Sequence, residues 1–297
     1  MALTFPVSEY TERQSAFLGQ LPSNSLVLIP TNPKSIRSND THYPFRANSY
    51  MLYLCDWNES DSVWMASNST GEWETTLFVL PRDTKAEIWE GRRVGPEGAA
   101  KYWPVDKAHS IADLREVIRP LLEDCSVVFS IAGLNSEIDA LLNDSGIEIS
   151  NPKSYLDALR VIKSEAEIEI MRKSSDLASE AHILAMREGN LGVGEWHLQS
   201  VIESCFTSNN AQWAYPSIVG GGDNAAILHY NTNQESVEDA QLVLIDAGSE
   251  GQGYTSAITR PRHVTGRITD TPRDINELSS KAHIASPEPL TTRGRSQ

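Results

Sequence analysis

The segment "LVLIDAGSEGQGYTSAITRPRHVTG", Leu242 to Gly266, is the most informative part of the second half of this chain. It opens as an apolar strand that ends on a carboxylate, Asp246. It then turns through glycines and returns as a second strand through Tyr254 and Ile258. This pattern predicts a hairpin that places Asp246 at the rim of a sheet.

Asp246 has two interpretations. A carboxylate held at a sheet rim needs a partner, because an isolated charge removed from water is costly, and a metal ion is one such partner. Alternatively, the aspartate caps its own turn through backbone N–H groups, and the hairpin alone slightly favours this second interpretation.

The returning strand bears on this choice, because alternate side chains of a strand share a face. Two sets are predicted: Tyr254, Ser256 and Ile258 on one side, and Thr255, Ala257 and Thr259 on the other. The methyl group of Ala257 cannot bind a cation. Two close cations need several carboxylates to offset their charge, so one aspartate is not enough.

The chain has 297 residues, which fits two domains, and its hydrophobic content of 40% is enough for packed cores. Its formal net charge of −15 argues against non-specific binding to nucleic acid or to an anionic membrane. The three cysteines are far apart and form no metal-binding pattern. We expect a cytoplasmic protein, because neither a signal peptide nor a membrane span is recognisable.

Residues 1–150 predict an α/β domain, because short apolar segments alternate with helical periodicity. The expected strands are Ser25–Pro30, Ser49–Trp57, Ser62–Ser67, Thr75–Asp83 and the segment "SVVFSIAG", and the expected helices are Ser110–Asp124 and the segment "NSEIDALLNDSG".

Residues 151–275 predict a second domain of α+β type. A long amphipathic helix runs from Ser164 to about Glu188, a second helix follows in "GEWHLQSVIESCFTSNN", and strands come after it. Residues 276–297 form a polar tail that we expect to be disordered, apart from one weak helix near Arg273–His283.

Two further segments hold candidate site residues. In "GGGDNAAILHY", Gly220–Tyr230, an apolar segment leads to His229, which is either a proton shuttle beside a cleft or a structural histidine. In "EIWEGRRVGPEGAA", Trp89, Arg92 and Arg93 form either a rim that meets a substrate or another subunit, or an ordinary exposed turn.

Several motifs in order resemble the aminopeptidase P branch of the creatinase, prolidase and methionine aminopeptidase superfamily. They are "FRANSYMLYL", "TLFVLPRD" and "IWEGRRVGPEGA" in the first domain, and "AYPSIVGGGDNAAILHY" and "LIDAGSEGQGYTSAITRPRHVTGRIT" in the second. The resemblance runs from about Tyr10 to about Leu278. It implies a creatinase-like α/β N-terminal domain followed by the first half of an α+β pita-bread catalytic domain.

The resemblance also implies a function. Members of the family remove an N-terminal residue that precedes proline from Xaa-Pro peptides, using two divalent ions, usually Mn²⁺, held by two aspartates, one histidine and two glutamates. Asp246 matches the first aspartate, in "DAG". His229 matches a substrate-side histidine that assists catalysis, and Tyr215 matches a tyrosine near the metal site.

This sequence departs from the family pattern where the second aspartate is expected. The pattern Y-x-x-D-I-T-R reads here from Tyr254 to Arg260 with Ala257 in the ligand position, and the remaining three ligands are expected beyond Gln297. The "F-R-x-N-S" motif is followed by Tyr50, where bacterial relatives usually have aspartate. We therefore expect an incomplete metal site and a chain that is inactive or nearly so.

Two alternatives stay open beside a truncated peptidase. One is a non-catalytic oligomerisation partner or regulator, because the N-terminal domain of relatives helps build dimers or tetramers, and this chain is itself expected to form a homo-oligomer. The other is the product of an imperfect gene model, because the family pattern fades after "PRDINEL". Prolidase and creatinase are less favoured, because the motifs "WEGRRVG" and "GGGDNAAILHY" are closer in sequence to aminopeptidase P.

Overall fold

The computed structural model describes residues 3–238, 241–264, 277–278, 280–282 and 284–285. The chain divides into two compact units, Met1–Ala166 and Glu167–Gln297. This division lies beyond residue 150, where the sequence places the boundary, because helix α7 (Lys153–Val161) buries Leu156 in the core of the first unit.

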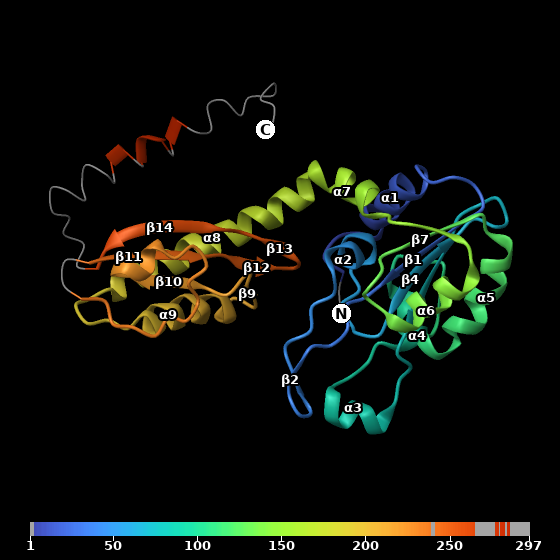
Figure 1. Ribbon diagram of the computed structural model, residues 1–297, viewed down its shortest axis with the longest axis horizontal. Helices are drawn as coiled ribbons and strands as arrows, with labels where there is room; N and C mark the ends of the chain where they lie inside the picture. Colours follow the sequence, from blue (N-terminus) through green and yellow to red (C-terminus); the bar gives the residue numbers. More distant parts are fainter. Residues whose placement is uncertain (1–2, 239–240, 265–276, 279, 283, 286–297) are drawn as a thin grey trace. The chain divides into compact units, whose positions relative to one another are not determined.

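The first unit combines a six-stranded sheet with helices (Figure 1). Besides α7, its helices are α1 (Val7–Leu18), α2 (Ser49–Cys55), α3 (Thr84–Glu90), α4 (Gly95–Tyr102), η1 (Ile111–Asp113), α5 (Leu114–Asp124) and α6 (Ser136–Ser145). Its strands are β1 (Ser25–Pro30), β2 (Ile36–Ser38), β3 (Thr41–His42), β4 (Val63–Ser67), β5 (Glu74–Val79), β6 (Lys107–Ser110), β7 (Val127–Ser130) and β8 (Glu148–Ser150). The sheet order is β6-β5-β4-β1-β7-β8, with β2 and β3 paired separately.

Strand β1 lies at the centre of this unit and is buried along its whole length. Leu26 and Leu28 face α5 and α6, whereas Val27 and Ile29 face α1, α2, α4 and α7. Burial on both faces explains why the strand reads as a continuous apolar run. Helices therefore cover both faces of a mixed sheet, which confirms the predicted α/β class.

The segment Ser49–Trp57, predicted as a strand, is instead mostly helix α2. The side chain of Asn48 accepts hydrogen bonds from the backbone N–H groups of Tyr50 and Met51, which caps the first turn. Asp56 then ends the helix in the left-handed conformation. The prediction was wrong because an apolar run of this length fits a strand as well as a helix.

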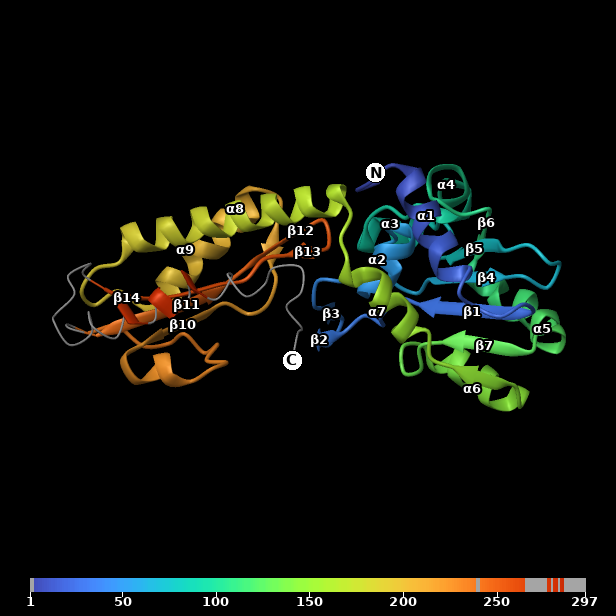
Figure 2. The same cartoon turned by 90° about the horizontal axis from the view of Figure 1, so that it is seen from above.

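The second unit contains α8 (Glu165–Glu188), α9 (Glu195–Ser208) and η2 (Gly222–Ala226), with α8 starting just before the division. Its strands are β9 (Gln212–Trp213), β10 (Ile218–Gly221), β11 (Leu242–Ala247), β12 (Ser249–Gly251), β13 (Tyr254–Thr255) and β14 (Ile258–His263). They form two sheets, β10-β11-β14 and β13-β12-β9. Figure 2 shows α8 running beside β11 and β14. The two long helices agree with the predicted α+β unit.

The hairpin is interrupted where it passes from one sheet to the other. Both of its arms break, between β11 and β12 and between β13 and β14, whereas the sequence suggested one continuous returning strand. Gly248 lies at this crossing, where a Cβ atom would stand 1.8 Å from the carbonyl oxygen of Ser256. Only a residue without a side chain allows this close approach.

Of the predicted tail, the residues that the structure describes between 277 and 285 are helical. The prediction of disorder for the rest of 276–297 lies outside the described residues. No helix in the described part of the chain is long and apolar enough to cross a membrane.

Candidate functional site

Asp246 lies on the face of β11 that points away from the helices. Its neighbours Ile245 and Ala247 are buried in the core formed with α8 and α9, so the alternation of the strand turns Asp246 to the opposite side. In the register of the sheet, Asp246 is opposite Ile218 of β10 and opposite Thr259 of β14. The carboxylate is half-buried at the rim of the sheet, as the sequence predicts.

The partner of Asp246 is Tyr215, whose hydroxyl group donates a short hydrogen bond to Asp246 Oδ1. Burial, together with the nearby negative charge of Asp246, raises the pKa of Tyr215 above its ordinary value, so the hydroxyl keeps its proton. The tyrosine is held in place because the N–H of Ala214 donates to the carbonyl of Gly248 at 2.8 Å. The structure thus brings two predicted site residues together.

The turn after Asp246 is held by other groups. The N–H of Ser249 donates to Ser256 Oγ at 3.1 Å, and the N–H of Ser256 donates to the carbonyl of Ser249 at 2.9 Å. Asp246 accepts a hydrogen bond from a side chain, and none from the turn that follows it within the described chain. The interpretation of Asp246 as a turn cap is therefore replaced by a tyrosine–carboxylate pair.

The faces predicted for the returning segment are confirmed. Thr255, Ala257 and Thr259 are exposed, whereas Tyr254, Ser256 and Ile258 are buried or half-buried. Since Thr259 is opposite Asp246, Ala257 lies diagonally across from it on the same side of the hairpin. Among the described residues, no three His, Cys, Asp or Glu side chains are close enough together to hold a metal ion.

His229 lies on an exposed loop rather than at the end of a strand. The glycine-rich segment forms the short helix η2, and the apolar residues after it point to solvent, with Leu228 87% exposed. His229 therefore stands where a bound molecule could reach it, and it lacks the burial expected of a structural core histidine.

The loop that carries His229 is held by Glu195, a residue that the sequence analysis did not single out. Glu195 is fully buried, and its Oε1 accepts hydrogen bonds from the N–H of Gly221 at 2.8 Å and from Asn224 Nδ2 at 3.2 Å. Its Oε2 accepts from the hydroxyl of Tyr230 at 2.8 Å and from the N–H of Glu235 at 3.0 Å. Glutamate in the first turn of a helix is common, so no local pattern signals this burial.

Asn233, in the same loop, forms hydrogen bonds with the backbone along the edge of β10 that is not paired with β11. Its Oδ1 accepts from the N–H of Val219 at 3.0 Å, and its Nδ2 donates to the carbonyl of Ser217 at 2.7 Å and to Gln199 Oε1 at 2.9 Å. The side-chain amide thus takes the place of a neighbouring strand along this edge.

Trp89, Arg92 and Arg93 belong to the first unit, whereas Asp246 belongs to the second. Trp89 is 88% exposed and Arg92 is also exposed. Arg93 donates to the carbonyl of Pro81 at 3.3 Å and to Glu90 Oε2 at 3.3 Å, so part of its charge is used locally. This arrangement agrees with both interpretations from the sequence, an ordinary exposed turn and a rim that meets a substrate or another subunit.

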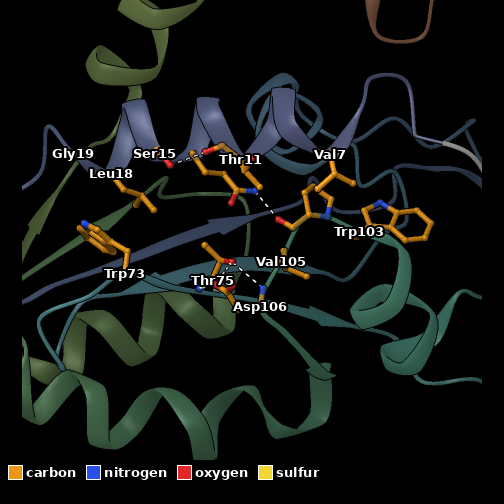
Figure 3. A pocket seen from close by; sticks show the side chains of 12 residues that line it. Val7, Thr11, Ser15, Leu18, Gly19, Trp73, Thr75, Trp103, Val105 and Asp106 are labelled. Atoms are coloured by element: carbon orange, nitrogen blue, oxygen red, sulfur yellow. Dashed lines mark hydrogen bonds between the residues drawn. The ribbon is translucent and has the colours of Figure 1, made fainter.

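A groove of about 430 Å³ lies within the first unit, between α1 and the start of β5 and β6 (Figure 3). Its lining includes Trp73, Trp103, Thr75 and Asp106. Asp106 Oδ2 accepts from the N–H and the hydroxyl of Thr75, both at 2.8 Å, which ties two adjacent segments together. The charged group of the groove therefore has a structural role, and the predicted site residues lie elsewhere.

Comparison with known proteins decides the family. Residues 10–129 match the aminopeptidase P N-terminal domain, and residues 169–292 match metallopeptidase family M24. Proline aminopeptidase P II from Yersinia pestis has 32% sequence identity and a TM-score of 0.90, with 95% of this chain and 68% of that chain covered. The chain belongs to the aminopeptidase P family. Its fold is accordingly the aminopeptidase P N-terminal domain followed by an M24 pita-bread unit.

Other relatives agree. Aminopeptidase PepP of Pseudomonas aeruginosa has 33% identity and a TM-score of 0.90, over 95% of this chain and 67% of that one. The Xaa-Pro aminopeptidases of Haemophilus influenzae and Escherichia coli are 34% and 33% identical, over 93% and 91% of this chain. The chain spans 65% of the length of each of these two curated relatives.

Membership of a metallopeptidase family implies a divalent metal, and a zinc-substituted E. coli aminopeptidase P has been solved in complex with product. The residues around Asp246 do not fit such an ion. One carboxylate is present, Tyr215 already donates to it, and position 257 carries a methyl group. Among the described residues there is no further cluster of ligands, and these residues support no catalytic step through a metal.

Proposed function

We propose that this chain derives from an Xaa-Pro aminopeptidase, an enzyme that removes an N-terminal residue preceding proline, and that the chain is catalytically deficient. The single observation that carries the proposal is the Asp246 face, which keeps the family scaffold and one family carboxylate but has Ala257, two residues before the Thr259 that is opposite Asp246, where the family has its second aspartate. A pair of Mn²⁺ ions, the cofactor that the resemblance implies, would need more negative charge than this face supplies.

The remaining residues have defined roles in this proposal. Tyr215 orients Asp246 by its hydrogen bond, and Glu195 holds the loop from which His229 projects. The exposure of His229 supports the role beside the substrate that the family resemblance implies, because a bound molecule can reach its imidazole. We also keep the cytoplasmic location as a prediction of this proposal.

The test is release of the first residue from an Xaa-Pro-Pro peptide by the full chain with added Mn²⁺. We expect no turnover above that of an Asp246→Asn control prepared in parallel. Clear turnover that the Asp246→Asn substitution abolishes would contradict the deficiency. Turnover that both proteins share would indicate a contaminating peptidase and leave the expected result standing.

A second candidate function is a non-catalytic partner that assembles with itself or with a full-length relative. The exposure of Ile88 and Trp89, at 78% and 88%, favours it, because large apolar side chains this open are common at interfaces. Size-exclusion chromatography with light scattering, alone and with a full-length relative, tests it. We expect a homo-oligomer that Trp89→Ser weakens, and a monomer in every mixture would contradict this function.

A further inference from the structure

We propose that the Asp246 face of the second unit is a metal-independent structure. The Tyr215 hydroxyl takes the place of the cation that would pair with a carboxylate in a metal site. Because position 257 carries alanine, the second negative charge that would require a cation is absent. The inference rests on the same Asp246 face as the proposed function, but it concerns the folding of this face, and its test does not measure turnover.

The first step is the partner of the carboxylate. Asp246 is half-buried between the adjacent strands, where an unpaired charge would be costly. A hydroxyl that donates to a carboxylate makes a charge-assisted hydrogen bond, stronger than a bond between neutral groups. Because the N–H of Ala214 is bonded to the carbonyl of Gly248, the Tyr215 donor is fixed to the same hairpin that presents Asp246.

The second step is the charge across the hairpin. Ala257 is diagonal to Asp246 and exposed on the same side. Diagonal positions of a hairpin lie about 7–8 Å apart. An aspartate at 257 would add a second carboxylate at about this distance from Asp246, and two like charges this near repel each other unless a cation lies between them. With alanine there is no such repulsion.

The third step is what this implies for stability. A cation that binds only the folded state stabilises it in proportion to how far its concentration exceeds the dissociation constant. A single carboxylate that already accepts a hydrogen bond offers too few ligands for a hard divalent ion. The folded face should therefore have the same stability with Mn²⁺ as without it.

Hydrogen exchange of peptides covering Leu242–Ala247, in the full chain, reports on this face and not on the first unit. It is measured in EDTA and in about 1 mM Mn²⁺, a concentration that would reveal any site binding tighter than this. We expect the native chain to exchange at the same rate in both. Tyr215→Phe should exchange about 10-fold faster in both, because Asp246 loses its donor.

The decisive variant is Ala257→Asp, with Ala257→Asn as a control of similar size without the charge. We expect Ala257→Asp to exchange faster than native in EDTA and to regain protection in Mn²⁺, whereas Ala257→Asn ignores the metal. Mn²⁺ protection of the native chain that Asp246→Asn removes would overturn the proposal, as would an Ala257→Asp variant indifferent to Mn²⁺. If Ala257→Asp does not fold, the native and Tyr215→Phe rates decide.

Discussion

At the scale of single residues, Gly248 is the most restricted position of the hairpin, because the backbone of Ser256 fills the space where a side chain would lie. We expect Gly248→Ala to destabilise the second unit by about 3 kcal/mol, since the clash is with backbone and the hairpin must shift to relieve it. Urea unfolding followed by hydrogen exchange of peptides covering Leu242–Ala247 measures this. Gly251→Ala is a suitable control, because its Cβ would only touch Ser174 Oγ at 3.4 Å. Equal loss in the two variants would contradict the prediction.

His182 links stability to pH. It is buried, its Nε2 lies 3.2 Å from the carbonyl oxygen of Ala247, and burial lowers its pKa below the ordinary value. The unfolded chain binds a proton at this histidine near pH 6.5, whereas the folded chain does so only at lower pH. Below about pH 6.5 the unfolded state therefore holds more protons, and stability falls as pH falls.

The corresponding measurement is urea unfolding of the native chain and of His182→Gln between about pH 5 and pH 7.5, a range that spans the ordinary histidine pKa. We expect the native chain to lose up to about 1.4 kcal/mol more per pH unit than the variant in the acidic part of this range. Above about pH 7 the two curves should run parallel. Parallel curves over the whole range would show that His182 does not contribute.

At the scale of elements, the loop between β10 and β11 depends on Glu195. We expect Glu195→Gln to speed hydrogen exchange of residues 221–235 and to cost about 2 kcal/mol, because an amide turns one buried acceptor into a donor that faces other donors. Glu180→Gln is the matched control on the neighbouring helix, where the glutamate is exposed. An unchanged exchange rate in Glu195→Gln would exclude this role.

The elements also show what the sequence could predict. Strand β1 and helix α8 were predicted because their periodicity and length are local properties. Helix α2 was missed because the Asn48 cap, and not the apolar run, decides its conformation. The break opposite Gly248 and the bond from Tyr215 to Asp246 join residues far apart in sequence, which no local pattern reveals. The resemblance to a family supplied the identity of Asp246, and the structure supplied its partner.

At the scale of the whole molecule, the first unit should fold without the second. Its sheet is covered by helices on both faces and has its own buried clusters, and α8 begins only at Glu165. A fragment of residues 1–163 is expected to show mixed helical and strand circular dichroism and one cooperative thermal transition. A fragment without a cooperative transition would contradict this independence.

Deamidation of the Asn233 side chain would weaken the second unit. Asparagine is thermally labile, and loss of ammonia from this side chain would put a carboxylate oxygen where Nδ2 now donates to Ser217 and Gln199. Both partners are acceptors, so repulsion would replace two hydrogen bonds and uncover the edge of β10. Deamidation of Asn233 should therefore add a negative charge at this edge and favour association of the protein through β10.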